Sequence, residues 1–167
     1  LAVCHNRRIH SNKVFKGKAA RGKTSTGWFY GLKLFLVINA FGEIMNAFLT
    51  MANVADNHLV TMIKLFSKLK GWAFADKGFI NQKAVEELLS KGLHLITGIR
   101  RNMKNKLVLM EQKILLQKRG VIESVNDILK TVCDIEHTRH RSPINALVNL
   151  YAGLCSYTFL DRLPSIF

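Results

Sequence analysis

The stretch "GWFYGLKLFLVINAFGEIMNAFLTMA", residues 27–52, predicts the centre of the fold. It is rich in aromatic and β-branched residues, which favour strands, and it is interrupted at "NAFGE". We therefore expect a hairpin of two long strands, 28–38 and 43–50, with a turn near Gly42.

Shorter helices are predicted on the C-terminal side of this hairpin. Apolar residues recur at helical spacing over 59–66, where Asp56 or Asn57 is a suitable N-cap. The segment "NQKAVEELLSKG" predicts a second helix, which is capped by its Asn81 and stopped by its Gly92.

Two short apolar runs, 71–76 and 93–99, predict buried strands. We expect a short strand or turn over 107–113, then helices over 115–133 and 143–159. The 167 residues are 49% hydrophobic, which is enough for one sizeable core. The order of the elements therefore predicts one α/β domain built on a mixed sheet.

The charge balance points to a polyanionic partner. Lys and Arg number 25 and Asp and Glu number 11, for a formal net charge of +14. Nucleic acid and an anionic membrane surface both fit this balance. The longest apolar runs are short or interrupted by polar residues, so we expect no membrane span. Three scattered cysteines make no disulfide framework and fit a reducing cytosol.

Residues 5–26 are basic, polar and aperiodic, and we expect an exposed loop there. Within it, "GKAARGKT" matches the phosphate-binding P-loop pattern from Gly17 to Thr24, including Lys23. That pattern works only between a buried strand and a helix N-terminus. Because a polar stretch precedes it and a strand-like stretch follows it, nucleotide binding is the weaker alternative. The favoured interpretation is a basic loop that contacts phosphates.

A metal site of histidines and cysteines is also weakly supported. Cys133, His137 and His140 lie close together in the sequence, and Cys4 adjoins His5. None of these residues has the C-x-x-C or H-E-x-x-H spacing of structural zinc sites. Hydrogen bonds or phosphate contacts are therefore the preferred interpretation.

The segment "LLQKRGVIESVNDILK", 115–130, predicts a helix with an unusual polar strip. With Arg119 at 0° and about 100° per residue, Lys130 falls near 20°, Glu123 near 40° and Leu116 near 60°. The opposite side carries a wide apolar stripe that is expected to press on the sheet: Ile114, Leu115, Val121, Ile122, Val125, Ile128, Leu129 and Val132. The ordinary interpretation of the strip is an exposed Arg119–Glu123 ion pair worth about a few tenths of a kcal/mol.

Asp76 is the second acid of interest, because it directly follows the apolar run 71–75. Sites of α/β proteins commonly lie at the carboxyl ends of strands. The sequence leaves open whether Asp76 and Glu123 meet.

Several blocks of the chain resemble, in order, the catalytic domain of DDE-type transposases of bacterial insertion sequences. They are "KVFKGKAARGKTSTGWFYGLKLFLVIN", "FADKGFI", "LITGIRRNMKNK", "KRGVIESVNDILK" and "IEHTRHRSPINALVNLYAGL". Many members of the family carry Y-x-x-R-x-x-x-E-x-x-x-x-x-x-K around the third catalytic acid. Arg119, Glu123 and Lys130 match that spacing. Leu116 replaces the Tyr, and Phe35 stands where relatives often have His.

The resemblance implies one RNase H-like domain over 1–167, with a mixed sheet flanked by helices and an incomplete N-terminal strand. It also implies three catalytic acids, of which Asp76 is the second and Glu123 the third. The first is expected on the strand that ends near 1–3, just upstream of this chain. We therefore expect the chain alone to be inactive, and the missing Tyr fits a decayed copy.

The resemblance further implies two Mg²⁺ or Mn²⁺ ions, held by Asp76 and Glu123 in a site that also needs the missing acid. Such ions support DNA cleavage and strand transfer. The expected partner is DNA, both element ends and target, with a homo-oligomer in the active complex of a cytoplasmic, nucleoid-associated protein. The expected phosphate contacts are Arg119, Lys130, Lys77, Arg100, Arg101, Lys104 and Lys23. The alternative is a basic DNA-binding remnant that does not cleave.

Overall fold

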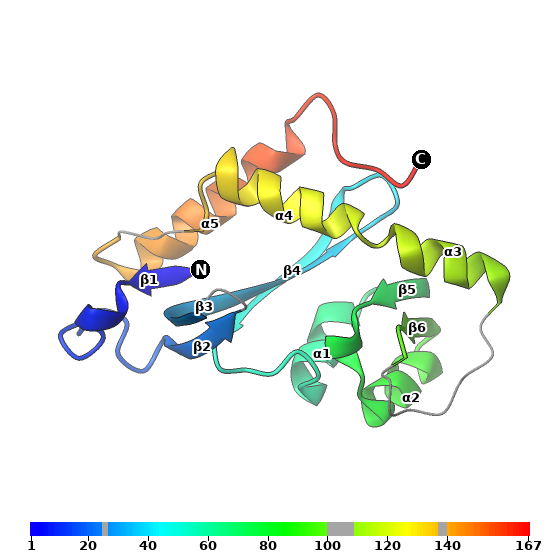
Figure 1. Ribbon diagram of the computed structural model, residues 1–167, viewed down its shortest axis with the longest axis horizontal. Helices are drawn as coiled ribbons and strands as arrows, with labels where there is room; N and C mark the ends of the chain where they lie inside the picture. Colours follow the sequence, from blue (N-terminus) through cyan, green and yellow to red (C-terminus); the bar gives the residue numbers. More distant parts are fainter. Residues whose placement is uncertain (25–26, 100–108, 137–139) are drawn as a thin grey trace.

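The computed structural model describes residues 1–24, 27–99, 109–136 and 140–167 (Figure 1). At its centre, β3 (Gly27–Ile38) pairs antiparallel with β4 (Ile44–Met51), from Leu32 opposite Met51 to Ile38 opposite Ile44. Asn39 closes the turn, because its side-chain oxygen accepts backbone N–H groups of the following residues. The predicted hairpin is confirmed.

Two short strands flank the first half of β3 on opposite edges, β1 (Ala2–Cys4) and β2 (Ala20–Thr24). The loop expected over 5–26 is therefore wrong in part, since it contains β2 and the 3₁₀ turn η1 (Asn6–Arg8). Gly22 gives a physical reason why this segment forms a strand paired with β3 and not a loop. A Cβ at Gly22 would lie 2.8 Å from the Cβ of Ala52, so only glycine lets β2 approach this closely.

The second sheet is a parallel pair, β5 (Gly71–Ala75) and β6 (Leu93–Thr97), connected through α2 (Gln82–Ser90). Asn81 caps α2 by accepting the Ala84 N–H at 3.2 Å. Gly92 ends the connection with φ of +85°, a conformation that favours glycine. Both predicted boundary residues are confirmed.

The predicted cap of α1 (Leu59–Phe66) is wrong. The helix begins after His58, one residue later than Asn57. Asp56 instead pairs with Lys33 of β3, with Nζ and Oδ1 3.0 Å apart. This ion pair fastens the loop before α1 to the hairpin.

The mixed α/β fold is confirmed, but its strands form two sheets rather than one. Three cores adjoin β3, and one of them gathers around Phe15 and Tyr30 near β1 and β2. The other two lie on the two faces of β3. Phe35 joins a core with α1, α2, β5 and β6, whereas Leu34 and Leu36 pack toward the other core under α4 (Val121–Thr131) and α5 (Pro143–Thr158). Figure 1 shows α4 and α5 together along the first sheet, with α3 (Met110–Lys118) extending over β5 and β6.

The helix expected over 115–133 is divided in two. Arg119 ends α3 and Gly120 precedes α4, and two tight i→i−3 bonds, Ile122 N–H to Arg119 O and Glu123 N–H to Gly120 O, span the break. Glycine weakens a helix interior by about 1 kcal/mol, so a tertiary contact can bend the chain there. The strand or turn expected over 107–113 is wrong from Met110 onward, where α3 begins.

The apolar stripe predicted for this segment holds only in α4. Val125 and Leu129 are fully buried, whereas Ile114 and Val132 are 47% and 66% exposed. The break at Gly120 separates α3, which carries Ile114, from α4, so one wheel does not describe both helices. Val132 lies one residue beyond the end of α4. Across the described ranges, no helix has the length and apolar character needed to span a membrane.

Candidate active site

Asp76 lies at the carboxyl end of β5, just before the short 3₁₀ turn η2 (Lys77–Phe79). Its backbone is extended, with φ of −72° and ψ of 164°, so the chain leaves the strand here. The Asp76 side chain is 61% exposed. A carboxylate in this position is accessible to solvent, to a cation and to a partner.

Arg119 makes an ion pair with Asp76. Its Nη1 donates to Asp76 Oδ1 at 2.9 Å, and the Arg119 side chain is 41% exposed. This contact joins the end of β5 to the break between α3 and α4, 43 residues further along the chain. The ordinary interpretation of the polar strip was an ion pair between Arg119 and Glu123. In the structure, the ion-pair partner of Arg119 is Asp76 instead.

Glu123 occupies the exposed first turn of α4. It follows Arg119 by four residues, or roughly 6 Å along a helical axis. The ion pair therefore brings Asp76 to the turn that precedes Glu123. No group of three or more His, Cys, Asp or Glu side chains placed to hold a metal ion occurs among the described residues.

Lys130 lies at the other end of α4, near Leu1, the residue before β1. The pKa of the Leu1 amino group is lowered mainly by burial. Glu136 raises this pKa and Lys130 lowers it by smaller amounts. Both charged side chains therefore lie close to Leu1. The strip Arg119–Glu123–Lys130 consequently runs along α4 from the end of β5 toward β1.

The other predicted phosphate contacts lie apart from each other. Lys77 follows Asp76 directly, and its aliphatic chain lies against Gly98 at the end of β6. Lys23 lies on β2, where its Nζ is 5.7 Å from the ring centroid of Trp28. Three more predicted contacts lie outside the described residues: Arg100, Arg101 and Lys104.

The structure does not give the P-loop match its required context. Lys23 and Thr24 end β2, and the next described element is the strand β3 rather than a helix. The nucleotide-binding alternative required a strand followed by a helix at this position, and the structure has two successive strands instead.

The histidine and cysteine candidates are not brought together as a site in the described part of the chain. His137 lies outside that part. Burial raises the pKa of the Cys133 thiol, which keeps it protonated. The ring of His5 accepts the Arg7 backbone N–H at 3.3 Å and so caps η1.

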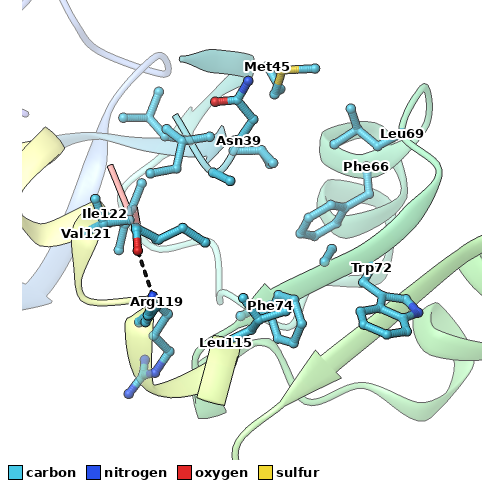
Figure 2. Close-up of a pocket in the computed structure, with 18 of the residues that line it drawn as sticks. Asn39, Met45, Phe66, Leu69, Trp72, Phe74, Leu115, Arg119, Val121 and Ile122 are labelled. Carbon is cyan, nitrogen blue, oxygen red and sulfur yellow. Dashed lines mark hydrogen bonds between the residues drawn. The ribbon is translucent and has the colours of Figure 1, made fainter. Parts of the chain in front are cut away.

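A groove of about 600 Å³ lies between the two sheets (Figure 2). One wall is the end of β3 and the other is β5. Phe66, the last residue of α1, and Leu69, in the segment after α1, contribute as well. Asp76 and Arg119 line the same groove, which is mostly apolar.

The edge of β3 at this groove has the geometry to accept a strand. Leu32 exchanges two backbone hydrogen bonds with Leu1, the residue before β1. The Leu1 amino group donates to Leu32 O at 3.0 Å, and the Leu32 N–H donates to Leu1 O at 2.9 Å. Because backbone groups alternate between the two edges of a strand, those of Leu34 and Leu36 point to the same edge. On the facing wall, β5 pairs with β6 alone among the described strands.

The C-terminal residues also reach this groove, which the sequence did not predict. The Ile166 N–H donates to Ala40 O at 3.1 Å, and Lys118 Nζ donates to Ile166 O at 2.8 Å. Phe167 stacks near Phe41, with ring centroids 5.7 Å apart. The only signal in the sequence is the apolar character of this short tail.

The described structure has a mixed α/β fold in which Asp76, at the end of β5, is paired with Arg119, and Glu123 lies on the helix that begins just after this arginine. Residues 1–143 match the family model described as the transposase DDE domain. The chain therefore belongs to this family, and the resemblance seen in the sequence is confirmed. The family implies that DNA is the partner and divalent metals the cofactors. Neither the curated proteins nor the solved structures gave a match to the chain.

Proposed function

We propose that this chain is a catalytic portion of a DDE transposase, acting in metal-dependent DNA cleavage and strand transfer through Asp76 and Glu123. The observation that carries the proposal is the Arg119–Asp76 contact of 2.9 Å. It joins the strand end that bears one family acid to the turn that precedes the other.

The two carboxylates suit a hard divalent cation such as Mg²⁺ or Mn²⁺. Both side chains are exposed, and both supply the oxygen donors that such ions prefer. When bound, the ions would activate a water or a 3′-hydroxyl and stabilise the leaving oxygen. In this proposal Asp76 and Glu123 provide protein ligands and fix where the reacting phosphate lies.

Arg119 is proposed to change partner when DNA binds. An exposed ion pair such as Arg119–Asp76 is worth only about 0–1 kcal/mol. A phosphate can therefore replace the carboxylate at the guanidinium at little cost, which frees Asp76 for a cation. Arg119 thereby holds the backbone beside the acids, and Lys130 and Lys77 extend the contact.

A third carboxylate is proposed to come from a strand that lies in the groove. A strand that continued the line of β1 past Leu32 would run along the edge of β3 formed by Leu34 and Leu36. It would meet β5 on its other side and would join the two sheets. An acid on that strand would then lie close to Asp76, as the family chemistry needs.

Manganese binding tests the pair directly. We expect Asp76→Asn and Glu123→Gln each to weaken Mn²⁺ binding at least about tenfold, by calorimetry or electron paramagnetic resonance. The matched control is Glu111→Gln, which removes an exposed acid from the first turn of α3. Equal losses in all three variants would show that the ion binds to surface charge in general.

Nicking of supercoiled DNA in Mg²⁺ or Mn²⁺ separates the proposal from its alternative when the protein tested includes the strand that carries the proposed third carboxylate. The net charge of +14 favours the alternative, a protein that binds DNA without cleaving it. Metal-dependent nicking that Glu123→Gln abolishes supports the catalytic function. DNA binding together with no specific Mn²⁺ site would establish the non-catalytic function instead.

A further inference from the structure

The outer face of α5 is apolar and exposed. With about 100° per residue, seven α5 side chains, including Tyr151, fall within roughly 60° of Tyr151 on the helical wheel. Leu154 lies at the border and is buried, and Thr158 is a polar member of the face. The other five are apolar or weakly polar and exposed. They are Ile144, Leu147, Val148, Tyr151 itself and Cys155. Ile144 is 70% exposed, Val148 61% and Tyr151 63%, and Phe159 extends the same surface beyond the helix end at 85%.

The inner face of α5 is already accounted for by the fold. Leu150, Leu154 and Tyr157 are buried in the core that α5 shares with α4. Gly153 lies so close to Ile135 that a Cβ there would be 2.3 Å from a side-chain carbon. The outer face is therefore a separate surface. It lies almost wholly beyond residues 1–143, the part that matches the family.

We propose that the outer face of α5 is the interface with a second copy of this chain. Two molecules that each carry +14 repel one another wherever their charged surfaces meet. Residues 142–160 contain no Asp, Glu, Lys or Arg, so this face lets two copies approach with the least repulsion. Exposed aromatic and aliphatic side chains then supply the apolar contact.

The charges at the two ends of this segment select the orientation. Arg141 precedes α5, and Asp161 and Arg162 follow it, all three exposed. Tyr151 lies midway, ten residues from Arg141 (151 − 141) and ten from Asp161 (161 − 151). An antiparallel two-fold crossing at Tyr151 places each Arg141 beside Asp161 and Arg162 of the other copy, which together carry no net charge, so the ends of the two helices do not repel. A parallel crossing would instead bring the two Arg141 side chains together.

Sedimentation velocity tests this dimer without DNA. We expect a dimer that strengthens as salt rises from about 0.1 M to about 0.5 M, because salt screens the repulsion between the copies. DNA binding by the same chain should weaken over this range, so the two behaviours are distinguishable. A chain that stays monomeric at both salt concentrations overturns the proposal, even if it binds vesicles of anionic lipid.

Two variants locate the interface. Tyr151→Asp should weaken dimerisation at least about tenfold, as expected for a central aromatic residue. Leu89→Asp is the matched control, because Leu89 is 47% exposed on α2 and should leave the dimer intact. Circular dichroism of both variants checks that they remain folded.

Crosslinking tests the crossing point. In a Cys155→Ser background, Tyr151→Cys places two thiols at the two-fold axis, and mild oxidation should give a covalent dimer. Ile144→Cys in the same background lies seven residues from the axis and should crosslink much less. Equal dimerisation of Tyr151→Asp and the wild type, or crosslinking through residue 144 alone, would rule out this arrangement.

Discussion

Arg119 Nη1 lies 2.9 Å from Asp76 Oδ1, and this single contact connects β5 to the break between α3 and α4. Both side chains are largely exposed, at 41% for Arg119 and 61% for Asp76. Water screens such a pair, so its contribution to folding is small. Its importance is positional, since it joins the end of β5, which bears Asp76, to the turn that precedes Glu123.

Removing this ion pair should therefore change stability little. We expect Arg119→Ala to lower the free energy of unfolding by less than about 1 kcal/mol, measured by urea denaturation. The coupling in a double-mutant cycle with Asp76→Ala should be equally small and should shrink at high salt. A coupling of several kcal/mol would mean that the pair is a structural lock and does not open for DNA.

The proposed phosphate contacts should appear in the salt dependence of DNA binding. Each of Arg119→Ala and Lys130→Ala should lower the slope of log affinity against log salt by about 1. Lys91→Ala serves as the control, because Lys91 lies on α2 in an ion pair with Glu87 at 2.7 Å. Fluorescence anisotropy on one duplex at several salt concentrations measures all three slopes. An unchanged slope for Arg119→Ala would remove it from the DNA contact.

Two glycines should respond oppositely to alanine. Gly22→Ala should destabilise the fold by about 1–3 kcal/mol, because its Cβ would overlap the Cβ of Ala52 at 2.8 Å. Gly120→Ala should stabilise it by about 0.4–1 kcal/mol, since Gly120 has φ of −56° and no atom within 4 Å of a Cβ there. Thermal and urea unfolding measure both changes. Destabilisation by Gly120→Ala would show that the break before α4 needs glycine.

Tyr157 should make stability fall at high pH. Burial, and secondarily Cys133, raise the pKa of the Tyr157 phenol, whose hydroxyl donates to Gly42 O at 2.8 Å. The folded state keeps this proton where the unfolded chain loses it. The stabilisation is thus complete below the ordinary pKa of about 10 and is lost as pH rises through the raised value.

Replacement of Tyr157 tests this linkage. Tyr157→Phe should cost about 1–3 kcal/mol at neutral pH, because the carbonyl of Gly42 loses its buried donor. The decline in unfolding free energy above about pH 10 should become shallower in the same variant. Tyr151→Phe removes an exposed hydroxyl and should keep the wild-type profile. An unaltered decline in Tyr157→Phe would assign the effect to other groups.

Local patterns predicted the hairpin, the two strands β5 and β6 and the boundary residues of α2 well. Long runs of strand-forming residues in β3 and β4, and the side chain of Asn81, act within a few residues of the chain. Local patterns failed for β2 and for the break at Gly120. In both places the conformation depends on a distant partner: Ala52 against Gly22, and Asp76 with Arg119.

The sequence by itself determined the family and the identity of the candidate acids, because order and spacing along the chain carry both. The tertiary structure alone decided that Arg119 pairs with Asp76 rather than with Glu123. It also decided that β3 and β5 leave a groove between them, and that the outer face of α5 stays uncovered. These are relations between segments far apart in the chain, and packing in three dimensions sets them.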